Sequence, residues 1–555
     1  MEEKQTIAQS NEGKLFNFRL ALFAAIYLAL GVVVCFYCRF YDLSALWILA
    51  LIPAAAFPVL LSFSWEKWKK ALTAFSVLCI CFFVGFMGFY SQCNRYDKTT
   101  DFGECTFSGR VVEIREYSAG SRVVLDNLKV EGEKQNCKLV TYLPASFVEN
   151  ITLSDELLLR GDVTKREFPA EGFSSSAKDF GKGIYLEADN VEGVKTGHRF
   201  DLFLFLNARA KAVIDAGMDE TPAAVTRAVL LGDTTGIEWG LYNNIRRGGI
   251  AHIFAVSGLH VGALFGLCLF LLKKTPMKVL HGALRFGFVA FVLFTYAGVC
   301  AFSSSVVRAT VICLAAYLGM LLQVKTDFLQ SLGVAAICIL TFTPSALFTA
   351  GFQLSFAACF GIAFLSKPIG QVCDECAKLY RKVFPVKLTE AELKAIANDD
   401  TAPPRISTRI YRAVKSFLSA SLGAQIFTAP LLLQYFGYVS GWALLLNGIF
   451  VPFIGAIFSL LLLFVLVACV LPIGLSVGIL YLPNIVWSAV LLLFEVVDFT
   501  SFALEGVAIT SGLSLVYLLS TLFFTDKWNL KKSLRFVLGG VCIFAFVAGM
   551  VALNC

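Results

Sequence analysis

Apolar runs long enough to cross a lipid bilayer recur along most of this chain. A helix needs about 20 mostly apolar residues to span a hydrocarbon core about 30 Å thick, and about thirteen such runs follow Arg19. Hydrophobic residues make up 57% of the 555 residues and charged residues 16%, and the mean hydropathy is +0.72. Because a surface of that composition is too apolar for a water-soluble protein, the pattern predicts a polytopic α-helical membrane protein.

The apolar runs form an N-terminal group of three and a longer C-terminal group. The first run, 20–37, is too long for the core of a signal peptide and lacks a small-x-small cleavage site, so we expect it to be retained. The stretch 442–499 leaves room for one re-entrant segment. The expected spans are 19–37, 44–63, 71–89, one that begins near 251, 281–301, 305–322, 329–342, 348–365, 417–433, 442–470, 475–499, 511–524 and 536–553.

Basic links between the runs predict the side of the membrane on which each loop lies. Loops on the cytoplasmic side carry an excess of Lys and Arg, and the link 65–70 (WEKWKK) is basic. If this link is inside, the third run delivers the polar segment 92–196 to the outside. Alternation then places the links 272–278, 325–327, 367–415 and 526–535 inside, which agrees with their basic residues.

The polar segment reads as a small β domain. Five short stretches alternate in polarity or are rich in β-branched residues, and five strands in about 95 residues favour a small barrel with an OB-like fold. In an oxidising outer compartment, two of the three cysteines Cys93, Cys105 and Cys137 could form a disulfide, and the sequence does not say which two. The expected strands are 108–115, 121–130, 138–142, 156–160 and 184–188.

The charge of this domain argues against tight, independent DNA binding. Residues 104–198 contain 12 Lys and Arg against 16 Asp and Glu, which leaves four net negative charges. Non-specific affinity for DNA comes mainly from the neutralisation of phosphates, so an acidic domain binds it weakly. A local patch at Lys165 and Arg166, with stacking from Tyr142 or Phe168, stays open.

Residues 199–248 have an amphipathic rather than a spanning pattern. Apolar positions are interrupted by charge, as in 201–214 (DLFLFLNARAKAVI), so we expect helices at the outer surface of the membrane. The predicted domains are therefore a three-span segment (1–91), an extracytoplasmic β domain (92–198), amphipathic surface helices (199–248) and a transmembrane channel domain (249–555).

The segment 249–262 (GIAHIFAVSGLHVG) places two of the four histidines and a serine at the start of a membrane helix. If the helix is continuous, Gly258, Gly262 and Gly266 lie four residues apart on one edge, where another helix could approach closely. His260 lies about 200° round the axis from Gly258, so the polar groups face elsewhere. A histidine in a span faces the bundle interior or water, which makes His252, Ser257 and His260 candidate channel or gating residues, although bonding to a neighbouring span would explain them equally well.

This segment resembles the signature of the ComEC competence proteins, which reads AHLLAISGLHV. Here the corresponding residues 251–261 are AHIFAVSGLHV, and the order and approximate spacing agree from Arg227 to about 470. Three further segments match and add channel candidates: Arg308 in 305–309 (SVVRA), Gln353 in 351–356 (GFQLSF) and Gln425 in 424–430 (AQIFTAP), with Asn447 beyond them. The resemblance implies a channel in the bacterial cytoplasmic (inner) membrane that translocates single-stranded DNA inward during natural transformation.

The chain departs from many ComEC relatives in one respect. Those proteins end in a metallo-β-lactamase-like domain, which needs a histidine-rich cluster to hold metal, and this chain has no H-x-H motif. We therefore expect no enzyme activity, metal or cofactor, and a separate nuclease and DNA-receptor proteins as partners. The lone C-x-x-C at Cys373 and Cys376 lacks a second pair.

The driving force for transport is expected to come from elsewhere. No G-x-x-x-x-G-K-[ST] phosphate loop is present, so a cytoplasmic ATP-driven motor or helicase, or the proton gradient, must act. Arg246 and Arg247 are expected at the outer mouth, where they could steer DNA, and homo-oligomer formation stays open. The alternative reading is a secondary transporter of another anionic polymer or a lipid intermediate, and a purely structural scaffold explains the polar spans poorly.

Overall fold

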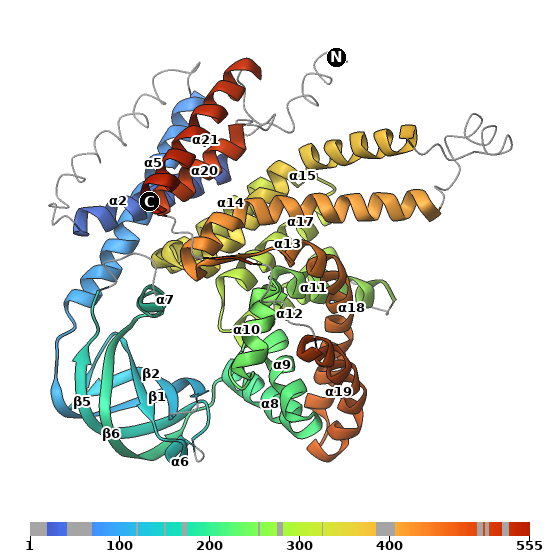
Figure 1. The fold of residues 1–555 in the computed structure, drawn as a ribbon. Coiled ribbons are helices and arrows are strands. Elements are labelled where there is room, and N and C mark those ends of the chain that lie inside the picture. Colours follow the sequence, from blue (N-terminus) through green and yellow to red (C-terminus); the bar gives the residue numbers. More distant parts are fainter. Residues whose placement is uncertain are drawn as a thin grey trace.

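A computed structural model shows a helical membrane part and a small β domain (Figure 1). Seven helices of the described residues are long and apolar enough to cross a membrane, and three more are apolar but shorter. The chain is therefore a multi-pass membrane protein, while the count of about thirteen spans stays a prediction. The expected run 44–63 lies outside the described residues. These are 19–40, 69–117, 120–148, 151–168, 175–253, 256–274, 281–324, 326–383, 406–496, 503–505, 510–523 and 532–554.

The first two described helices form a parallel pair that meets at glycines, since Phe36 lies near Phe89 and Arg39, at the end of the first helix, pairs with Asp97, at the end of the second. Helix α2 (Leu20–Phe40) packs on α5 (Lys69–Asp97), and a Cβ on Gly31 would lie 2.1 Å from the carbonyl oxygen of Phe82. Gly85 approaches α2 equally closely, so the two backbones touch where no side chain separates them. Arg19, just before α2, forms an ion pair with Asp327 at the start of α14 (Phe328–Phe342), with 2.9 Å between Nη2 and Oδ2.

The β domain is a sheet that closes on itself. Its strand order is β1-β5-β6-β4-β2-β3, and an additional β1–β2 pairing joins the ends. All pairings are antiparallel except β4–β6, and residues along β5 alternate between buried and exposed, as in a barrel wall. The five predicted strands are confirmed with wider bounds. The strands are β1 (Gly103–Tyr117), β2 (Gly120–Val130), β3 (Glu133–Lys134), β4 (Lys138–Leu143), β5 (Asp155–Lys165) and β6 (Ile184–His198).

The cysteines of this region differ from the expectation. Cys93, Cys105 and Cys137 are all buried free thiols in the structure, so the predicted disulfide is wrong. Burial raises the pKa of the Cys137 thiol to about 11, which keeps it protonated near neutral pH. These residues act as small apolar side chains in the core that the β domain shares with α2 and α5.

Helices α8 (Leu202–Gly217), α9 (Glu220–Leu231) and α10 (Trp239–Arg247) were expected at the membrane surface, and this placement stays a prediction. Most of α9 is buried, and the side chain of Phe203 on α8 fills the space above Gly298 of α12 (Gly282–Val299). Arg209 on α8 donates to the carbonyl oxygens of Cys469 and Leu471, at 3.2 and 2.6 Å. The two carbonyls lie at the end of α18 (Ala443–Val470), so α8 is tied to the bundle.

The remaining helices build the bundle that carries the candidate site. Figure 1 shows α15 (Ala350–Val383) and α17 (Ile406–Phe436) side by side as a long hairpin, in yellow and orange. The two touch at glycines, since a Cβ on Gly361 would lie 2.1 Å from the oxygen of Gly423. The other elements are α11 (Gly258–Lys274), α13 (Ser304–Leu322), the 3-10 helix η4 (Pro344–Phe348), α19 (Ile473–Val496), α20 (Ser511–Phe523), α21 (Lys532–Asn554), and the short strands β7 (Tyr438–Ser440) and β8 (Ala503–Glu505).

Polar and aromatic contacts fix the β domain to one end of the bundle, and the aromatic one joins Phe180 to Phe89 of α5. The amide of Gln92 on α5 donates to the carbonyl oxygen of Phe180 and to the hydroxyl of Ser345, both at 3.0 Å. Phe180 belongs to α7 (Ser175–Gly181) of the β domain, and Ser345 belongs to η4, directly before α15. The β domain therefore lies at the end of the bundle where α15 begins.

Candidate functional site

The segment 249–262 does not form a continuous helix. Gly249 has a φ of +77°, and a Cβ on it would lie 2.6 Å from the Cβ of Ala443, so only glycine suits this position. A short 3-10 turn, η2 (Ala251–Ile253), follows, and α11 begins only at Gly258. The prediction of a helix from Ala251 is wrong, and residues 254–255 lie outside the described residues.

The break separates the polar residues of the motif. His252 lies in the 3-10 turn and is exposed, whereas His260 lies in the first turn of α11 and is fully buried. The backbone N–H of Ser257 donates to Nδ1 of His260 at 3.1 Å, and Ser257 O accepts from the His260 N–H at the same distance. These two bonds make Ser257 and His260 a compact cap at the start of α11.

His260 carries one polar atom that the surrounding helices leave unsatisfied. Its ring stacks on Phe458 of α18, with 4.3 Å between centroids and 18° between planes. Because Nδ1 accepts a hydrogen bond, the neutral ring carries its proton on Nε2, which is buried and has no partner within the described part of the chain. A buried donor without an acceptor costs about 1–3 kcal/mol.

Arg308 is a buried cation between three helices. Its side chain rises from α13, is part of a residue only 8% exposed, and donates from Nη1 to the carbonyl oxygen of Ser355 on α15 at 2.8 Å. The same nitrogen contacts the sulfur of Cys359. Its Nε has no partner, and no carboxylate in the described ranges lies within ion-pair distance of the guanidinium. Burial without an acidic partner is costly for a charged group.

The three glycines of the predicted seam have different surroundings among the described residues. A Cβ on Gly258 would lie 3.2 Å from Nη2 of Arg308 and 3.5 Å from Cβ of Ala309, so α11 and α13 approach closely there. Among the described residues, no atom would lie within 4 Å of a Cβ on Gly262 or Gly266, and Gly266 is exposed. The helix-packing role of Gly258 therefore has a described neighbour, whereas that of Gly262 and Gly266 stays a prediction.

The other channel candidates make hydrogen bonds of their own or have a polar atom without a partner among the described residues. The amide of Gln353 donates to the carbonyl oxygen of Leu347 at 2.9 Å, and that of Gln425 donates to the hydroxyl of Ser421 at 3.0 Å. Both bonds are local, within a turn or along one helix. Asn447 on α18 is buried, and its Oδ1 has no partner among the described residues. Asn447 thus joins His260 and Arg308 as a buried polar side chain with an unused atom.

Arg246 is engaged with aromatic rings. Its guanidinium carbon lies 5.2 Å from the ring centroid of Phe436 and 5.1 Å from that of Tyr438. The hydroxyl of Tyr438 donates to the backbone oxygen of Arg246 at 2.9 Å, which anchors α10 to β7. Cation–π contact and anchoring explain Arg246 structurally, and its steering role stays a prediction, as does that of the half-buried Arg247.

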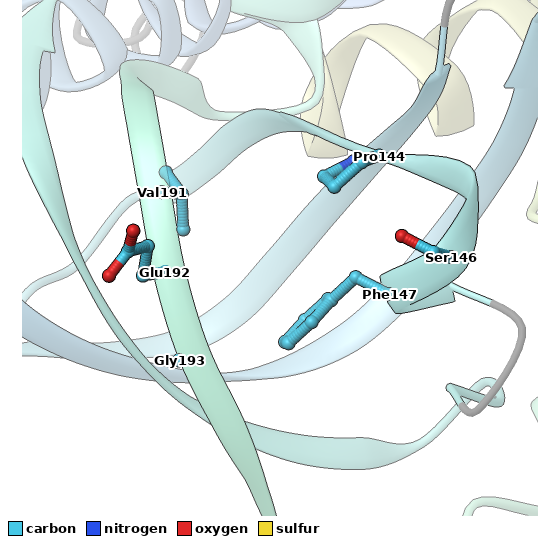
Figure 2. A pocket seen from close by; sticks show the side chains of 6 residues that line it. All are labelled: Pro144, Ser146, Phe147, Val191, Glu192 and Gly193. Atoms are coloured by element: carbon cyan, nitrogen blue, oxygen red, sulfur yellow. The ribbon is translucent and has the colours of Figure 1, made fainter.

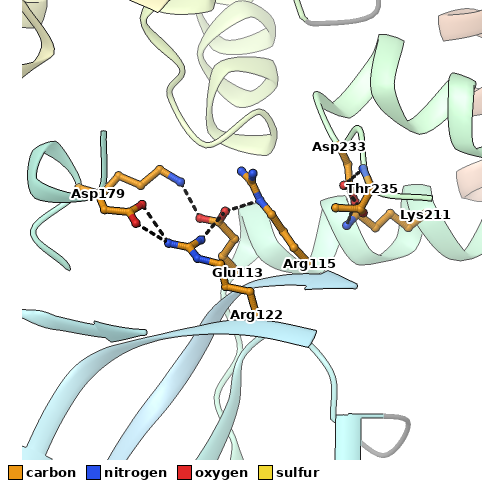
Figure 3. A network of polar contacts seen from close by, with 8 residues as sticks. Glu113, Arg115, Arg122, Asp179, Lys211, Asp233 and Thr235 are labelled. Atoms are coloured by element: carbon orange, nitrogen blue, oxygen red, sulfur yellow. Dashed lines mark hydrogen bonds and ion pairs between the residues drawn. The ribbon is translucent and has the colours of Figure 1, made fainter. Parts of the chain in front are cut away.

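The β domain carries a network of ion pairs on the side that faces the helices (Figure 3). Glu113 contacts Arg115 at 2.7 Å, Arg122 at 3.5 Å and Lys182 at 2.6 Å, and Arg122 also pairs with Asp179 at 2.9 Å. Burial alone would raise the pKa of Glu113, but the three cations outweigh it and lower the pKa to about 2. The network joins β1, β2 and α7.

A pocket of about 380 Å³ opens on the β domain between α6 (Ala145–Val148) and β6 (Figure 2). It is lined by Pro144, Ser146, Phe147, Val191, Glu192 and Gly193. The lining offers one carboxylate and no cation, so it does not suit phosphate groups. The cluster at the start of α11 is the better candidate site.

Sequence reasoning did not find the partners that surround this cluster. Phe458, Ser355 and Cys359 are apolar or small residues inside long apolar runs, and each lies far along the chain from the residue it contacts. Apolar periodicity marks helices, but it does not say which helix faces meet.

Comparisons with known proteins converge on one family. Residues 229–531 match the sequence model of the family described as Competence protein. The chain is also 29% identical to ComE operon protein 3 of Bacillus subtilis (strain 168) over 157 residues, which are 28% of this chain and 20% of that protein. The match thus spans about a fifth of that relative's length. No solved structure matches the chain significantly.

Proposed function

Because this chain belongs to the competence protein family, of the ComEC type, we propose that it acts in DNA uptake during natural transformation. We propose more specifically that it forms a channel through which single-stranded DNA crosses the cytoplasmic membrane. The observation that carries the proposal is that buried polar side chains lie within the residues that match the family. His260, Arg308 and Asn447 all lie in residues 229–531.

Buried polar atoms in a membrane bundle favour a transport role. Ionisable and amide groups among membrane helices are expensive, so they are expected where a polar substrate or water passes. Each of the three residues has a side-chain atom that the described part of the protein leaves without a partner. A bundle built only for stability would be expected to satisfy these atoms or to replace them with apolar groups.

The proposed topology places the β domain outside the cytoplasmic membrane. The end of the bundle next to the β domain holds the start of α15, and α11 begins at the same end. Lys273 and Lys274, in the last turn of α11, therefore lie at the opposite end. Basic residues favour the cytoplasmic side, which supports this orientation. The strand order of the barrel, with one parallel pair between β4 and β6, supports the proposal of an OB-like domain.

We propose that the chain transports without catalysing a reaction. Strand degradation would fall to a separate nuclease, delivery of DNA to receptor proteins, and the driving force to an ATP-driven motor or helicase in the cytoplasm. The absence of a phosphate-loop motif in the sequence supports an external motor.

Deletion of the gene in a transformable host tests the function directly. We expect labelled DNA to bind at the cell surface but not to enter the cytoplasm, and complementation with the full chain to restore entry. Unaltered entry would instead favour another substrate, such as a different anionic polymer or a lipid intermediate.

A further inference from the structure

Three helices begin at one place in the bundle. Gly258 at the start of α11 lies against Arg308, and a Cβ on Gly351 at the start of α15 would lie 3.6 Å from the hydroxyl of Ser304, the first residue of α13. We name this place the three-helix junction and define it by Gly258, Ser304, Arg308 and Gly351. It lies at the end of the bundle to which the β domain is fixed, because η4 leads directly into α15.

The junction concentrates positive charge that no acidic residue offsets within the described part of the chain. The N-terminus of a helix carries about half a positive charge, from N–H groups that have no partner inside the helix. None of α11, α13 and α15 has an acidic residue in its first turn, and the side chain of Ser303, which precedes α13, makes no capping bond. The Arg308 guanidinium adds a full charge at the same place.

The existing contacts of Arg308 leave this charge uncompensated. It donates to the neutral carbonyl of Ser355, contacts the thiol of Cys359 and lies 6.0 Å from the ring centroid of Phe356, and none of these groups is an anion. Its Nε has no partner among the described residues. Arg209 provides a contrast within the same chain. It also has no carboxylate partner among the described residues, but it caps the C-terminus of α18, where helix carbonyls carry negative charge. Arg308 instead points at a positive helix end.

We propose that the three-helix junction binds one phosphodiester group of the DNA strand during its passage. This inference rests on the proposed channel function and adds the residues that hold the substrate. A guanidinium and helix N-termini are the groups that proteins use to bind phosphate, one through paired N–H donors and the other through backbone N–H groups. A phosphodiester supplies the single negative charge that the junction lacks.

The position of the junction favours the DNA strand over a lipid headgroup. Arg308 lies between α11, α13 and α15 and is 8% exposed, whereas a headgroup would be expected on the outer, lipid-facing surface. The junction is closed in this structure, and a phosphate enters when the first turn of α11 moves away from Arg308. Gly258 suits this movement, because no side chain interlocks α11 with the guanidinium at that point.

The test measures binding of an oligothymidylate to the full chain in a maltoside detergent that contains no phosphate. For Arg308→Gln we expect at least about tenfold weaker binding, typical of a lost bond to a charged group. The slope of log affinity against log salt should become smaller by about 0.7, the value for one phosphate contact on a single strand. Binding of an oligomer with uncharged methylphosphonate linkages should not change.

Arg209→Gln is the matched control, because it removes a guanidinium that caps a helix. It should lower the unfolding temperature and leave both the affinity and the salt slope unchanged. Should Arg308→Gln fail to fold, Gly258→Ala takes its place, since the added methyl group would lie 3.2 Å from Nη2 and displace it. This variant should also weaken binding of the phosphodiester oligomer alone.

Three results would overturn the inference. The first is a folded Arg308→Gln variant that binds the oligomer with wild-type affinity and wild-type salt slope. The second is a Gly258→Ala variant that binds both oligomers with wild-type affinity. The third is that a short-chain phosphatidylglycerol displaces the bound oligomer from the wild-type protein at a lower concentration than free oligomer does. Each leaves the channel function standing if deletion of the gene still abolishes DNA entry. Unaltered entry after deletion would instead remove the proposed function, whatever the binding results.

Discussion

The imidazole of His260 stacks on the ring of Phe458, with 4.3 Å between the ring centroids and 18° between the planes. This contact joins the first turn of α11 to the middle of α18 and fixes the ring that accepts the Ser257 N–H. The His260 ring therefore has a face that packs against Phe458 and an edge whose Nε2 has no hydrogen-bond partner among the described residues.

Substitution of His260 separates these two properties. We expect His260→Gln and His260→Leu to accumulate in the membrane at near-normal levels and to lose DNA uptake, the Leu variant more completely. Glutamine can still accept the Ser257 N–H and donate to a substrate, whereas leucine can do neither. The measurements are immunoblots of membranes and entry of labelled DNA into the cytoplasm.

Phe458→Leu is the control for the stacking contact. It should lower stability by about 0.5–1.5 kcal/mol, the range for an aromatic pair, while uptake continues. Normal uptake by His260→Leu would show that the polar edge has no role in transport. Failure of both His260 variants to accumulate would favour a purely structural histidine.

The sequence predicts the elements of this fold better than their contacts. The strands of the β domain follow from alternating polarity, and β5 shows the same alternation in burial. The break before Gly258 is not predictable in this way, because it depends on the approach of Gly249 to Ala443, almost two hundred residues away. The same holds for Arg308 and Ser355, whose bond joins two separate apolar runs.

The glycines of α11 show a second limit of sequence patterns. Spacing alone treats Gly258, Gly262 and Gly266 alike, since all three lie on one edge of a helix. The structure separates them, because α13 approaches Gly258, whereas no described residue would contact a Cβ on Gly262 or Gly266. A glycine stripe thus predicts that close approach is allowed, and it does not say that a partner is present.

Leucine substitutions at the open glycines should be tolerated. We expect Gly262→Leu to change the free energy of unfolding by less than about 0.5 kcal/mol, because Gly262 is half-buried and no described atom would lie within 4 Å of its Cβ. Gly31→Ala should cost at least about 1–3 kcal/mol, because its Cβ would lie 2.1 Å from the oxygen of Phe82. Thermal unfolding of purified protein and its level in membranes compare the two. Equal losses would mean that α11 has a neighbour at Gly262.

Glu113 should make stability depend on pH in a defined window. Its pKa is lowered from an ordinary 4.5 to about 2 in the folded protein, so the unfolded state binds the proton more readily. The stabilisation is fully present above about pH 4.5 and is lost as the pH falls toward 2, with an upper limit of about 3 kcal/mol. Glu113→Gln should unfold at a lower temperature than wild type at pH 6, and the difference should vanish near pH 2.

Glu104→Gln is the control for that comparison. Glu104 pairs with Arg160 at 3.0 Å, but both side chains are about 70% exposed, so its removal should shift the unfolding temperature little at any pH. A constant difference between wild type and Glu113→Gln from pH 6 to pH 2 would contradict the role assigned to the cations around Glu113.

The ion pair between Arg19 and Asp327 should couple α2 to α14. Both guanidinium Nε and Nη2 donate to the carboxylate at 2.9–3.1 Å, and the Arg19 side chain is 6% exposed. Asp327 is 37% exposed, so solvent weakens the pair, and we expect a coupling energy of about 1 kcal/mol. A double-mutant cycle with Arg19→Gln and Asp327→Asn measures it, and additive effects would show that the pair contributes nothing.

Reporter fusions test the orientation of the whole chain. Gly132 is an exposed glycine with a φ of +86° in the turn between β2 and β3, so an insertion there should leave the barrel intact. Asp399 lies in the link 367–415, which its basic residues predict to be cytoplasmic. A reporter that is active only outside the cytoplasm should therefore be active near Gly132 and silent near Asp399. A cytoplasmic reporter at the same two positions supplies the control, because it should show the opposite pattern. The reverse result with both reporters would place the β domain and the three-helix junction on the cytoplasmic side, and Arg308 would then meet the strand as it leaves the bundle instead of as it enters.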